Sequence, residues 1–140
     1  MPVILLVEDN EGDIVLFKRA VRNCGLAWSI FPVHTGEAAV EFLCQVGEHA
    51  DAPRPDLVIL DLNLPGMLGA EVLRKIKNTS EWCDIPVVVF TSSDAAKDIQ
   101  TAYAGHASSY MVKPVDFNRL MRFVRAIDEW WFQLGALPSN

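Results

Sequence analysis

The sequence is poor in the residues that mark secreted scaffolds, disordered chains and membrane spans. Its 140 residues include only three cysteines, eight glycines and eight prolines. The number of cysteines is odd and none has C-x-x-C spacing, so neither a disulfide framework nor a zinc site is expected. No apolar run reaches the ~18 residues of a membrane span, and no cleavage site follows the apolar start of the chain. We therefore expect a soluble, unsecreted protein of the reducing cytoplasm.

Basic side chains are also scarce. Twelve Lys and Arg residues stand against 18 Asp and Glu residues, which gives a net charge of −6. Because binding to a phosphate backbone needs a basic surface, we do not expect nucleic acid to be a direct partner. Hydrophobic residues make up 51% of the chain, enough for a real core in a protein near the usual size of one domain.

What the sequence does contain is a regular alternation of short apolar runs and segments with helical periodicity. Strands are expected at 3–7, 28–33, 57–60, 87–90 and 109–112, and helices at about 13–24, 37–46, 70–77, 95–104 and 116–134. Five strand-then-helix units predict an α/β fold with a doubly wound, five-stranded parallel sheet, strand order 2-1-3-4-5, and helices on both faces. The segment 47–56 is expected to be a solvated crossover loop.

Polar residues follow four of the expected strands at the point where each strand ends. They are Glu8, Asp9, Asp61, Thr91, Ser92 and Lys113. Ligands of open parallel sheets bind beyond the carboxyl ends of the strands, so these side chains should meet at one edge. Three carboxylates and one ammonium leave a charge of about −2, which a divalent cation would balance. All-oxygen ligands without His or Cys favour Mg²⁺.

Four motifs stand in a fixed order along the chain: VEDN at 7–10, LDLNLPG at 60–66, FTSS at 90–93 and YMVKP at 110–114. Together they resemble the response-regulator receiver domain of bacterial two-component signalling. More narrowly, VEDN-x-x-D at 7–13 and the longer stretch at 52–66 resemble the stand-alone regulators that partner phytochrome-type histidine kinases. The resemblance implies a single receiver domain over residues 1–140, with 129–140 as an extension of the last helix and tail.

The resemblance also implies a role for each acidic residue. Asp61 matches the phospho-acceptor, a carboxylate nucleophile that takes a phosphoryl group from a phosphohistidine of a sensor histidine kinase. Asp9 matches a direct Mg²⁺ ligand, Glu8 a residue that usually holds the ion through water, and the backbone carbonyl of Asn63 a third protein ligand. The protein would then be a phospho-acceptor rather than a turnover enzyme.

The remaining motif residues match groups around the phosphoryl oxygens and the switch. Lys113 matches the ammonium, Thr91 the hydroxyl and Ser92 the backbone N–H that bind these oxygens. Tyr110 matches the aromatic residue that turns inward when Thr91 moves. The bond between Lys113 and Pro114 resembles the family's cis peptide. Because no effector domain follows, output is expected through protein contacts.

Two alternatives compete with this interpretation. A degenerate receiver would dock partners without being phosphorylated, but the complete set of acids, hydroxyl and lysine argues against it. A small phosphatase of the haloacid-dehalogenase type would need a general acid two residues after Asp61, where this chain has Asn63.

The last helix has an apolar band that is broader than one sheet face can cover. Phe123 and Trp130 widen it toward a second face. Exposed aromatics usually mark a partner surface, so we expect a homodimer through this helix and its tail. The alternative is that Trp130 folds against Trp28 or against the surface of the first helix and is buried within the monomer.

Overall fold

The computed structural model describes residues 1–113 and 116–134, with side chains as far as residue 132. Its centre is a sheet of five strands: β1 (Val3–Val7), β2 (Ser29–Val33), β3 (Leu57–Leu60), β4 (Val87–Thr91) and β5 (Ser109–Val112). All neighbouring strands are parallel, in the order β2-β1-β3-β4-β5. The predicted fold class and strand order are confirmed.

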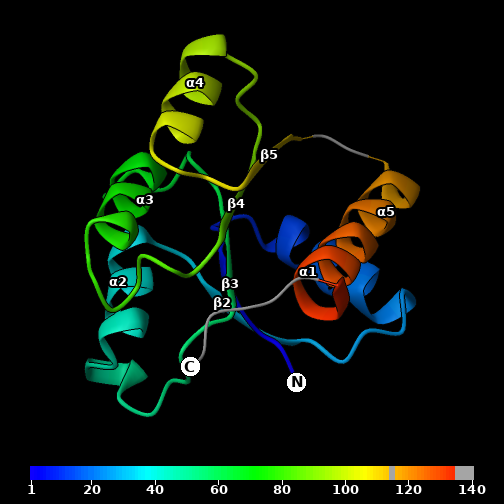
Figure 1. Ribbon diagram of the computed structural model, residues 1–140, viewed down its shortest axis with the longest axis horizontal. Coiled ribbons are helices and arrows are strands. Elements are labelled where there is room, and N and C mark those ends of the chain that lie inside the picture. The colour runs from blue at the N-terminus through cyan, green and yellow to red at the C-terminus, as the bar shows by residue number, and fades with distance from the viewer. Residues whose placement is uncertain (114–115, 135–140) are drawn as a thin grey trace.

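Five α-helices cover the two faces of the sheet: α1 (Glu11–Asn23), α2 (Gly36–Cys44), α3 (Gly69–Lys77), α4 (Ala96–Ala104) and α5 (Phe117–Ile127). Helices α1 and α5 lie on one face, and α2, α3 and α4 lie on the other (Figure 1). A π-helical segment, η2 (Asp128–Leu134), continues α5. None of the helices in the described ranges is long and apolar enough to cross a membrane.

The core has two layers because the sheet buries both of its faces. In β3, Val58 packs in the layer under α2 and α3, whereas the next residue, Ile59, packs in the layer under α1 and α5. Both side chains are almost fully buried. Alternation along a strand sends neighbouring side chains to opposite faces, so a strand in the middle of a two-sided sheet must be apolar throughout. The continuous apolar runs of the sequence have this cause.

Several element boundaries differ from the sequence predictions by one or more residues, and three of these differences bear on the argument. Helix α1 begins two residues early, at Glu11, because the side chain of Asn10 caps it by accepting the N–H of Asp13 at 2.9 Å. The expected crossover loop contains a short 3-10 helix, η1 (Gly47–His49). The last α-helix ends at Ile127, and its expected extension over 129–140 falls partly outside the described residues, as does Pro114.

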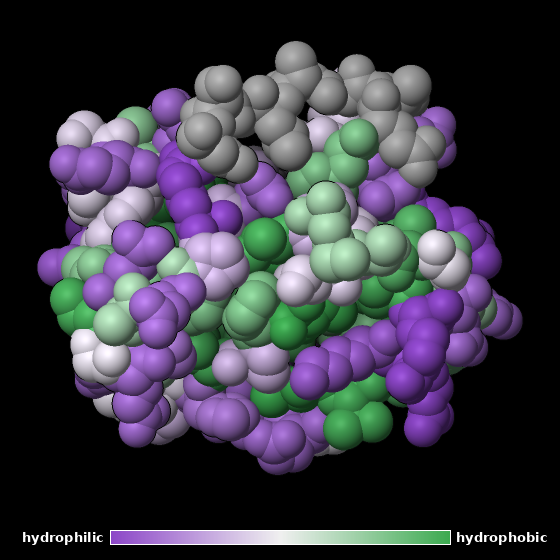
Figure 2. All heavy atoms as spheres, turned by 90° about the horizontal axis from the view of Figure 1, so that it is seen from below, coloured by the Kyte–Doolittle hydropathy of each residue, from purple (hydrophilic) through white to green (hydrophobic). Residues whose placement is uncertain are grey.

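The N-terminus lies at the end of the molecule where β1 begins (Figure 1). Seen from this side, apolar residues reach the surface in the middle of the molecule and hydrophilic residues line much of its outline (Figure 2). The predicted polar residues lie at the opposite, carboxyl ends of the strands.

Candidate functional site

Three carboxylates meet beyond the ends of β1 and β3. Glu8 and Asp9 follow the last residue of β1, and Asp61 follows the last residue of β3. One carboxylate oxygen from each lies within 4.8 Å of those of the other two. Glu8 and Asp61 are buried, whereas Asp9 is exposed. The parallel pairing of β1 with β3 therefore produces the acidic cluster that the sequence predicts.

Close packing behind the cluster depends on a glycine. Gly69, the first residue of α3, lies so close to the backbone of Asp61 and Leu62 that a Cβ atom there would overlap both. Its N–H donates to the carbonyl oxygen of Leu62 at 3.1 Å. This contact fixes the loop that leaves β3 and with it the position of Asp61.

Lys113 supplies the positive charge of the site from the end of β5. Its ammonium donates hydrogen bonds to Glu8, to Asp13 at 2.8 Å and to Asp61 at 3.3 Å. Burial alone would lower the pKa of Lys113, but the bonds to Asp13 and Glu8 and the charge of Asp61 outweigh it and hold that pKa above its ordinary value. Lys113 is therefore charged and already lies beside the expected phospho-acceptor.

The two buried carboxyls have pKa values displaced in opposite directions. Burial raises the pKa of Glu8 to about 7, although the Lys113 ammonium and the N–H of Asn10 oppose this. Burial would raise the pKa of Asp61 as well, but the N–H of Asn63, the Thr91 hydroxyl and the charge of Lys113 together lower it. Asp61 is thus the ionised member of the pair, as a nucleophilic carboxylate must be.

Asn63 joins the ends of β3 and β4. Its backbone N–H donates to Asp61 at 3.0 Å, and its side-chain amide donates to the hydroxyls of Thr91 at 3.4 Å and Ser92 at 3.2 Å. Thr91 is fully buried and Ser92 is exposed. The amide therefore arranges both hydroxyl-bearing residues around Asp61.

Tyr110 lies farther along the same edge, on β5. Its hydroxyl donates to the backbone carbonyl of Ser93 at 2.9 Å, and the Ser93 hydroxyl donates to Asp98 of α4 at 2.5 Å. Burial raises the pKa of the Tyr110 hydroxyl, which remains a neutral donor. The expected switch residue is thus bonded to the loop that begins two residues after Thr91.

Asp13 is an acidic residue of the site that strand-end reasoning does not find. It lies in the first turn of α1, where it accepts a hydrogen bond from Lys113. The signal in the sequence is the final Asp of VEDN-x-x-D at 7–13, since a capping Asn10 turns the helix so that Asp13 faces the strand ends.

The donor set fits a hard divalent cation. Glu8, Asp9 and Asp61 offer only oxygen ligands, and no His or Cys joins the cluster within the described ranges. The same residues line a cleft of about 590 Å³, which leaves room for an ion with several waters and for a phosphoryl group. A metal site of the Mg²⁺ type is therefore consistent with both the chemistry and the space.

The two residues expected at a dimer interface lie in different surroundings. Phe123 is half-buried, with its ring 6.3 Å from that of Phe90, whereas Trp130 is 64% exposed. Trp28 packs instead against Phe132, with ring centroids 5.7 Å apart, and donates its indole N–H to Asp128 at 2.9 Å. The alternative in which Trp130 folds against Trp28 is wrong, because Phe132 takes that place.

Fold and site together define a receiver domain. Residues 4–125 match the family described as "Response regulator receiver domain", and the chain belongs to this family. It is 37% identical over 137 residues to response regulator Rcp1 of Synechocystis sp. (strain ATCC 27184 / PCC 6803 / Kazusa), covering 98% of this chain and 93% of Rcp1. It is 40% identical over 137 residues to the probable methanogenesis regulatory protein FilR2 of Methanothrix harundinacea (strain 6Ac), covering 98% and 88% of the two chains.

Solved structures give the same result. The phosphorylated cyanobacterial phytochrome response regulator RcpA is similar with a TM-score of 0.90 and 40% identity, covering 99% of both chains. The Mn²⁺-bound form of Rcp1 is similar with a TM-score of 0.89 and 37% identity, covering 99% of this chain and 100% of that one. The protein is a response regulator of the receiver-domain class with a divalent-cation site.

Proposed function

We propose that Asp61 accepts a phosphoryl group from a phosphohistidine of a sensor histidine kinase. The observation that carries the proposal is the environment of Asp61, a buried and ionised carboxylate bonded to Lys113 at 3.3 Å and next to two further acids. An oxygen of Asp61 forms the new O–P bond while the P–N bond of the phosphohistidine breaks and its imidazole leaves. The protein is a phospho-acceptor in this step rather than a turnover enzyme.

Different residues around Asp61 stabilise the negative charge on different oxygens of the transferred phosphoryl group. Glu8, Asp9, Asp61 and the backbone carbonyl of Asn63 would hold Mg²⁺, which when bound neutralises part of the charge on the phosphoryl oxygens. Lys113 binds a phosphoryl oxygen on another side, and the Thr91 hydroxyl and the Ser92 N–H bind the rest. Because Lys113 is shared with Glu8 and Asp13, phosphorylation requires its ammonium to shift its bonds toward the new group.

Tyr110 is the proposed link between phosphorylation and output. Movement of Thr91 toward the phosphoryl group displaces the loop at Ser93, which accepts the Tyr110 hydrogen bond. Losing that acceptor frees the ring to change its position, which alters the surface around β5 and α4.

Intact mass spectrometry after incubation with acetyl phosphate and Mg²⁺ tests the phosphorylation site. The wild type should gain the mass of one phosphoryl group, and Asp61→Asn should gain none. Asp51→Asn, at an exposed carboxylate away from the cluster, is the matched control and should be labelled like the wild type. Label that persists in Asp61→Asn would overturn the assignment, and an unlabelled wild type would support the phosphorylation-independent docking module instead.

A phytochrome-type kinase is the partner we infer for this regulator. The inference is supported by the similarity of nearly the whole chain to RcpA, which is described as a phytochrome response regulator. A cytoplasmic location follows from such a partner and agrees with three free cysteines in the described structure. Phosphotransfer from a purified phytochrome-type kinase, compared with transfer from an unrelated histidine kinase, tests the pairing through the relative rates.

A homodimer formed through α5 and η2 is the further part of this proposal, with Phe123 and Trp130 at the interface. Its support is the exposure of Trp130 beside a helix whose other aromatics are packed. Sedimentation at roughly 100 µM should show a wild-type dimer and a monomeric Trp130→Glu variant. Tyr103→Glu, at a 48% exposed aromatic on α4, is the control and should remain dimeric. A monomeric wild type, or a dimeric Trp130→Glu, would contradict this interface.

A further inference from the structure

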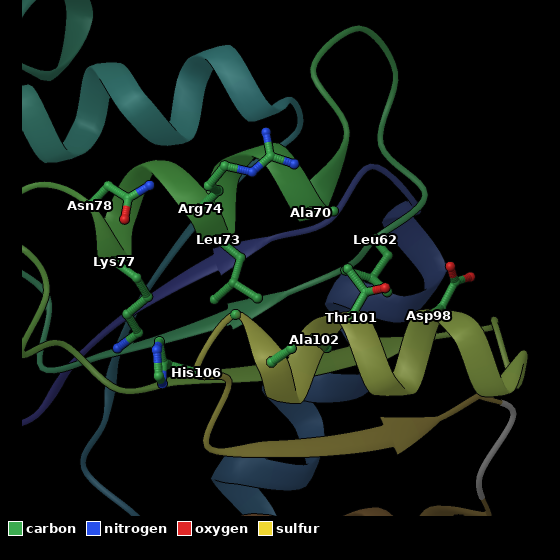
Figure 3. Close-up of a pocket in the computed structure, with 12 residues that line it drawn as sticks. Leu62, Ala70, Leu73, Arg74, Lys77, Asn78, Asp98, Thr101, Ala102 and His106 are labelled. Atoms are coloured by element: carbon green, nitrogen blue, oxygen red, sulfur yellow. The ribbon is translucent and has the colours of Figure 1, made fainter.

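A second cleft lies between α3 and α4, apart from the acidic cluster. Its volume is about 390 Å³, within the roughly 300–1,000 Å³ of small-molecule sites. Its floor is apolar and is formed by Leu62, Ala70, Leu73 and Ala102 (Figure 3). None of the residues given a role in phosphoryl transfer lines it.

Two side chains with remaining hydrogen-bonding capacity, the half-buried Lys77 and the exposed His106, line one end of this cleft. Lys77 and His106 are placed there together (Figure 3). The Lys77 ammonium donates to the backbone carbonyls of Ile85 at 2.6 Å and Cys83 at 3.1 Å, which fixes its position and leaves one N–H over. Neither this N–H nor the His106 ring has a hydrogen-bond partner among residues 1–113 and 116–132. The two side chains can therefore bind one anionic group between them.

The backbone of His106 gives an independent reason to assign this residue a role. Its φ is +71°, in the left-handed region that favours glycine. His106 follows the C-cap of α4. Its N–H donates to the backbone carbonyl of Tyr103 at 3.0 Å, and the N–H of Ala107 donates to the backbone carbonyl of Ala102 at 2.9 Å. Glycine usually occupies this position, yet here the glycine is one residue earlier, at Gly105. A strained position that keeps a large polar side chain in a cleft is typical of a functional residue.

The charges around the cleft favour an anion with an apolar body. Arg74, Lys77 and His106 line it, and Asp98 is the carboxylate among its lining residues. Asp84 does not line the cleft but lies close enough to Lys77 to act on its charge. The Asp98 carboxylate is at the other end and already accepts the Ser93 hydroxyl at 2.5 Å. Such a local excess of basic groups contrasts with the net charge of −6 of the whole chain.

We propose that the cleft between α3 and α4 binds a small amphiphilic carboxylate. The carboxylate lies between Lys77 and His106, and the apolar body covers Leu73 and Ala102. The cleft is present in the unphosphorylated protein, so its test does not depend on the proposed phosphorylation of Asp61.

Titration of the ¹⁵N-labelled protein with octanoate, followed by amide NMR shifts, tests the site. Saturable shifts should be confined to amides that line the cleft, such as those of Leu73, Ala102 and His106. The neutral probe octanol should bind at least about tenfold more weakly, as expected when a charge-assisted hydrogen bond is lost. Shifts that fail to saturate by about 10 mM octanoate, shifts at another surface, or equal binding of octanol would each overturn the proposal.

The variant His106→Gly separates a binding role from a structural one. Because glycine suits the left-handed backbone, this variant should melt at the same temperature as the wild type or higher, yet bind octanoate about tenfold more weakly. Lys97→Ala, at an exposed lysine of α4 that does not line the cleft, is the matched control and should bind as the wild type does. Unchanged affinity in His106→Gly would contradict the assignment.

Discussion

Single residues at the strand ends are arranged so that one ammonium serves several carboxylates. Lys113 contacts Glu8, Asp13 and Asp61, while Asp9 lies at the exposed rim of the same cluster without a bond to it. One positive charge cannot neutralise this number of acids, so the folded state is destabilised by repulsion until a cation binds. The acidic residues are therefore expected to lower the stability of the protein while they enable its chemistry.

Replacing Asp9 by alanine should therefore stabilise the metal-free protein. The variant lacks one of three mutually repelling carboxylates, so its melting temperature in EDTA should exceed that of the wild type. Mg²⁺ should raise the melting temperature of the wild type by mass action and have little effect on the variant. Thermal melts of both proteins with EDTA and with Mg²⁺ measure this, and identical wild-type melts in the two buffers would contradict a metal site.

The raised pKa of Glu8 predicts how stability depends on pH in EDTA. The pKa is about 7 in the folded protein against an ordinary 4.5, so between these values the folded state binds more protons than the unfolded state. The free energy of unfolding should therefore fall as pH rises from about 4.5 to 7. Asp61 and Lys113 do not act in this window, because their displaced pKa values affect stability below 3.8 and above 10.5.

Urea unfolding at a series of pH values, for wild type and Glu8→Gln, checks this slope. The wild type should lose up to roughly 3 kcal/mol across the window, and the variant, which cannot titrate at this position, should show a flatter profile. A wild-type profile that is flat from pH 4.5 to 7 and loses stability only below pH 4.5 would show that Lys113, rather than burial, controls the Glu8 carboxyl.

Most of the site could be predicted from the sequence because parallel strands end at a common edge. That rule places Glu8, Asp9, Asp61 and Lys113 together without any knowledge of their side-chain conformations. The rule does not predict Asp13, because Asp13 lies on a helix. Its side chain faces the strand ends only because of the rotation of α1, which depends on where that helix begins. The sharing of Lys113 among three acids likewise depends on distances that no sequence pattern contains.

At the scale of elements, a buried long-range hydrogen bond anchors the start of η2. The indole of Trp28 donates to Asp128 at the start of η2, and both groups are buried. The sequence predicted that Trp130 would turn toward a second face, and Trp130 is exposed. It did not predict that Phe132 would contact Trp28, since the band was interpreted with the period of an α-helix. The wider turn of a π-helix shifts the register of each side chain, so Phe132 contacts Trp28 and Trp130 faces outward.

Trp28→Phe should lower the free energy of unfolding by about 1–3 kcal/mol, the cost of losing a buried hydrogen bond to a charged group. Trp130→Phe, which changes an exposed indole in the same way, should alter it by no more than about 0.5 kcal/mol. Urea denaturation of the two variants at low protein concentration compares them directly. Equal losses would mean that Trp130 is as well packed as Trp28.

At the scale of the whole molecule, the two core layers share one sheet. Trp28 reports on the layer under α1 and α5, and Trp82 packs against the layer under α2 and α3. Because each strand contributes alternate side chains to both layers, neither layer can be lost while the sheet remains. The two halves of the fold should therefore unfold together.

Variants that keep only Trp28 or only Trp82 as fluorophore test this cooperativity. Their urea transitions should have midpoints and slopes that agree with one another and with the far-ultraviolet circular dichroism of the same variant. Separate midpoints within one variant would indicate that one layer unfolds before the other.

Helix α4 stands apart from this cooperative unit. Of its nine residues only Ala102 is buried, and no side chain caps its first turn at Ala95. In native-state hydrogen exchange, the amides of α4 should therefore exchange through a local opening whose free energy is well below that of global unfolding. The amides of β1 and β3 should exchange only when the whole protein unfolds. Because little free energy is needed to open α4, the free energy of forming a single aspartyl phosphate can displace this helix while the strands of the sheet remain folded and protected from exchange.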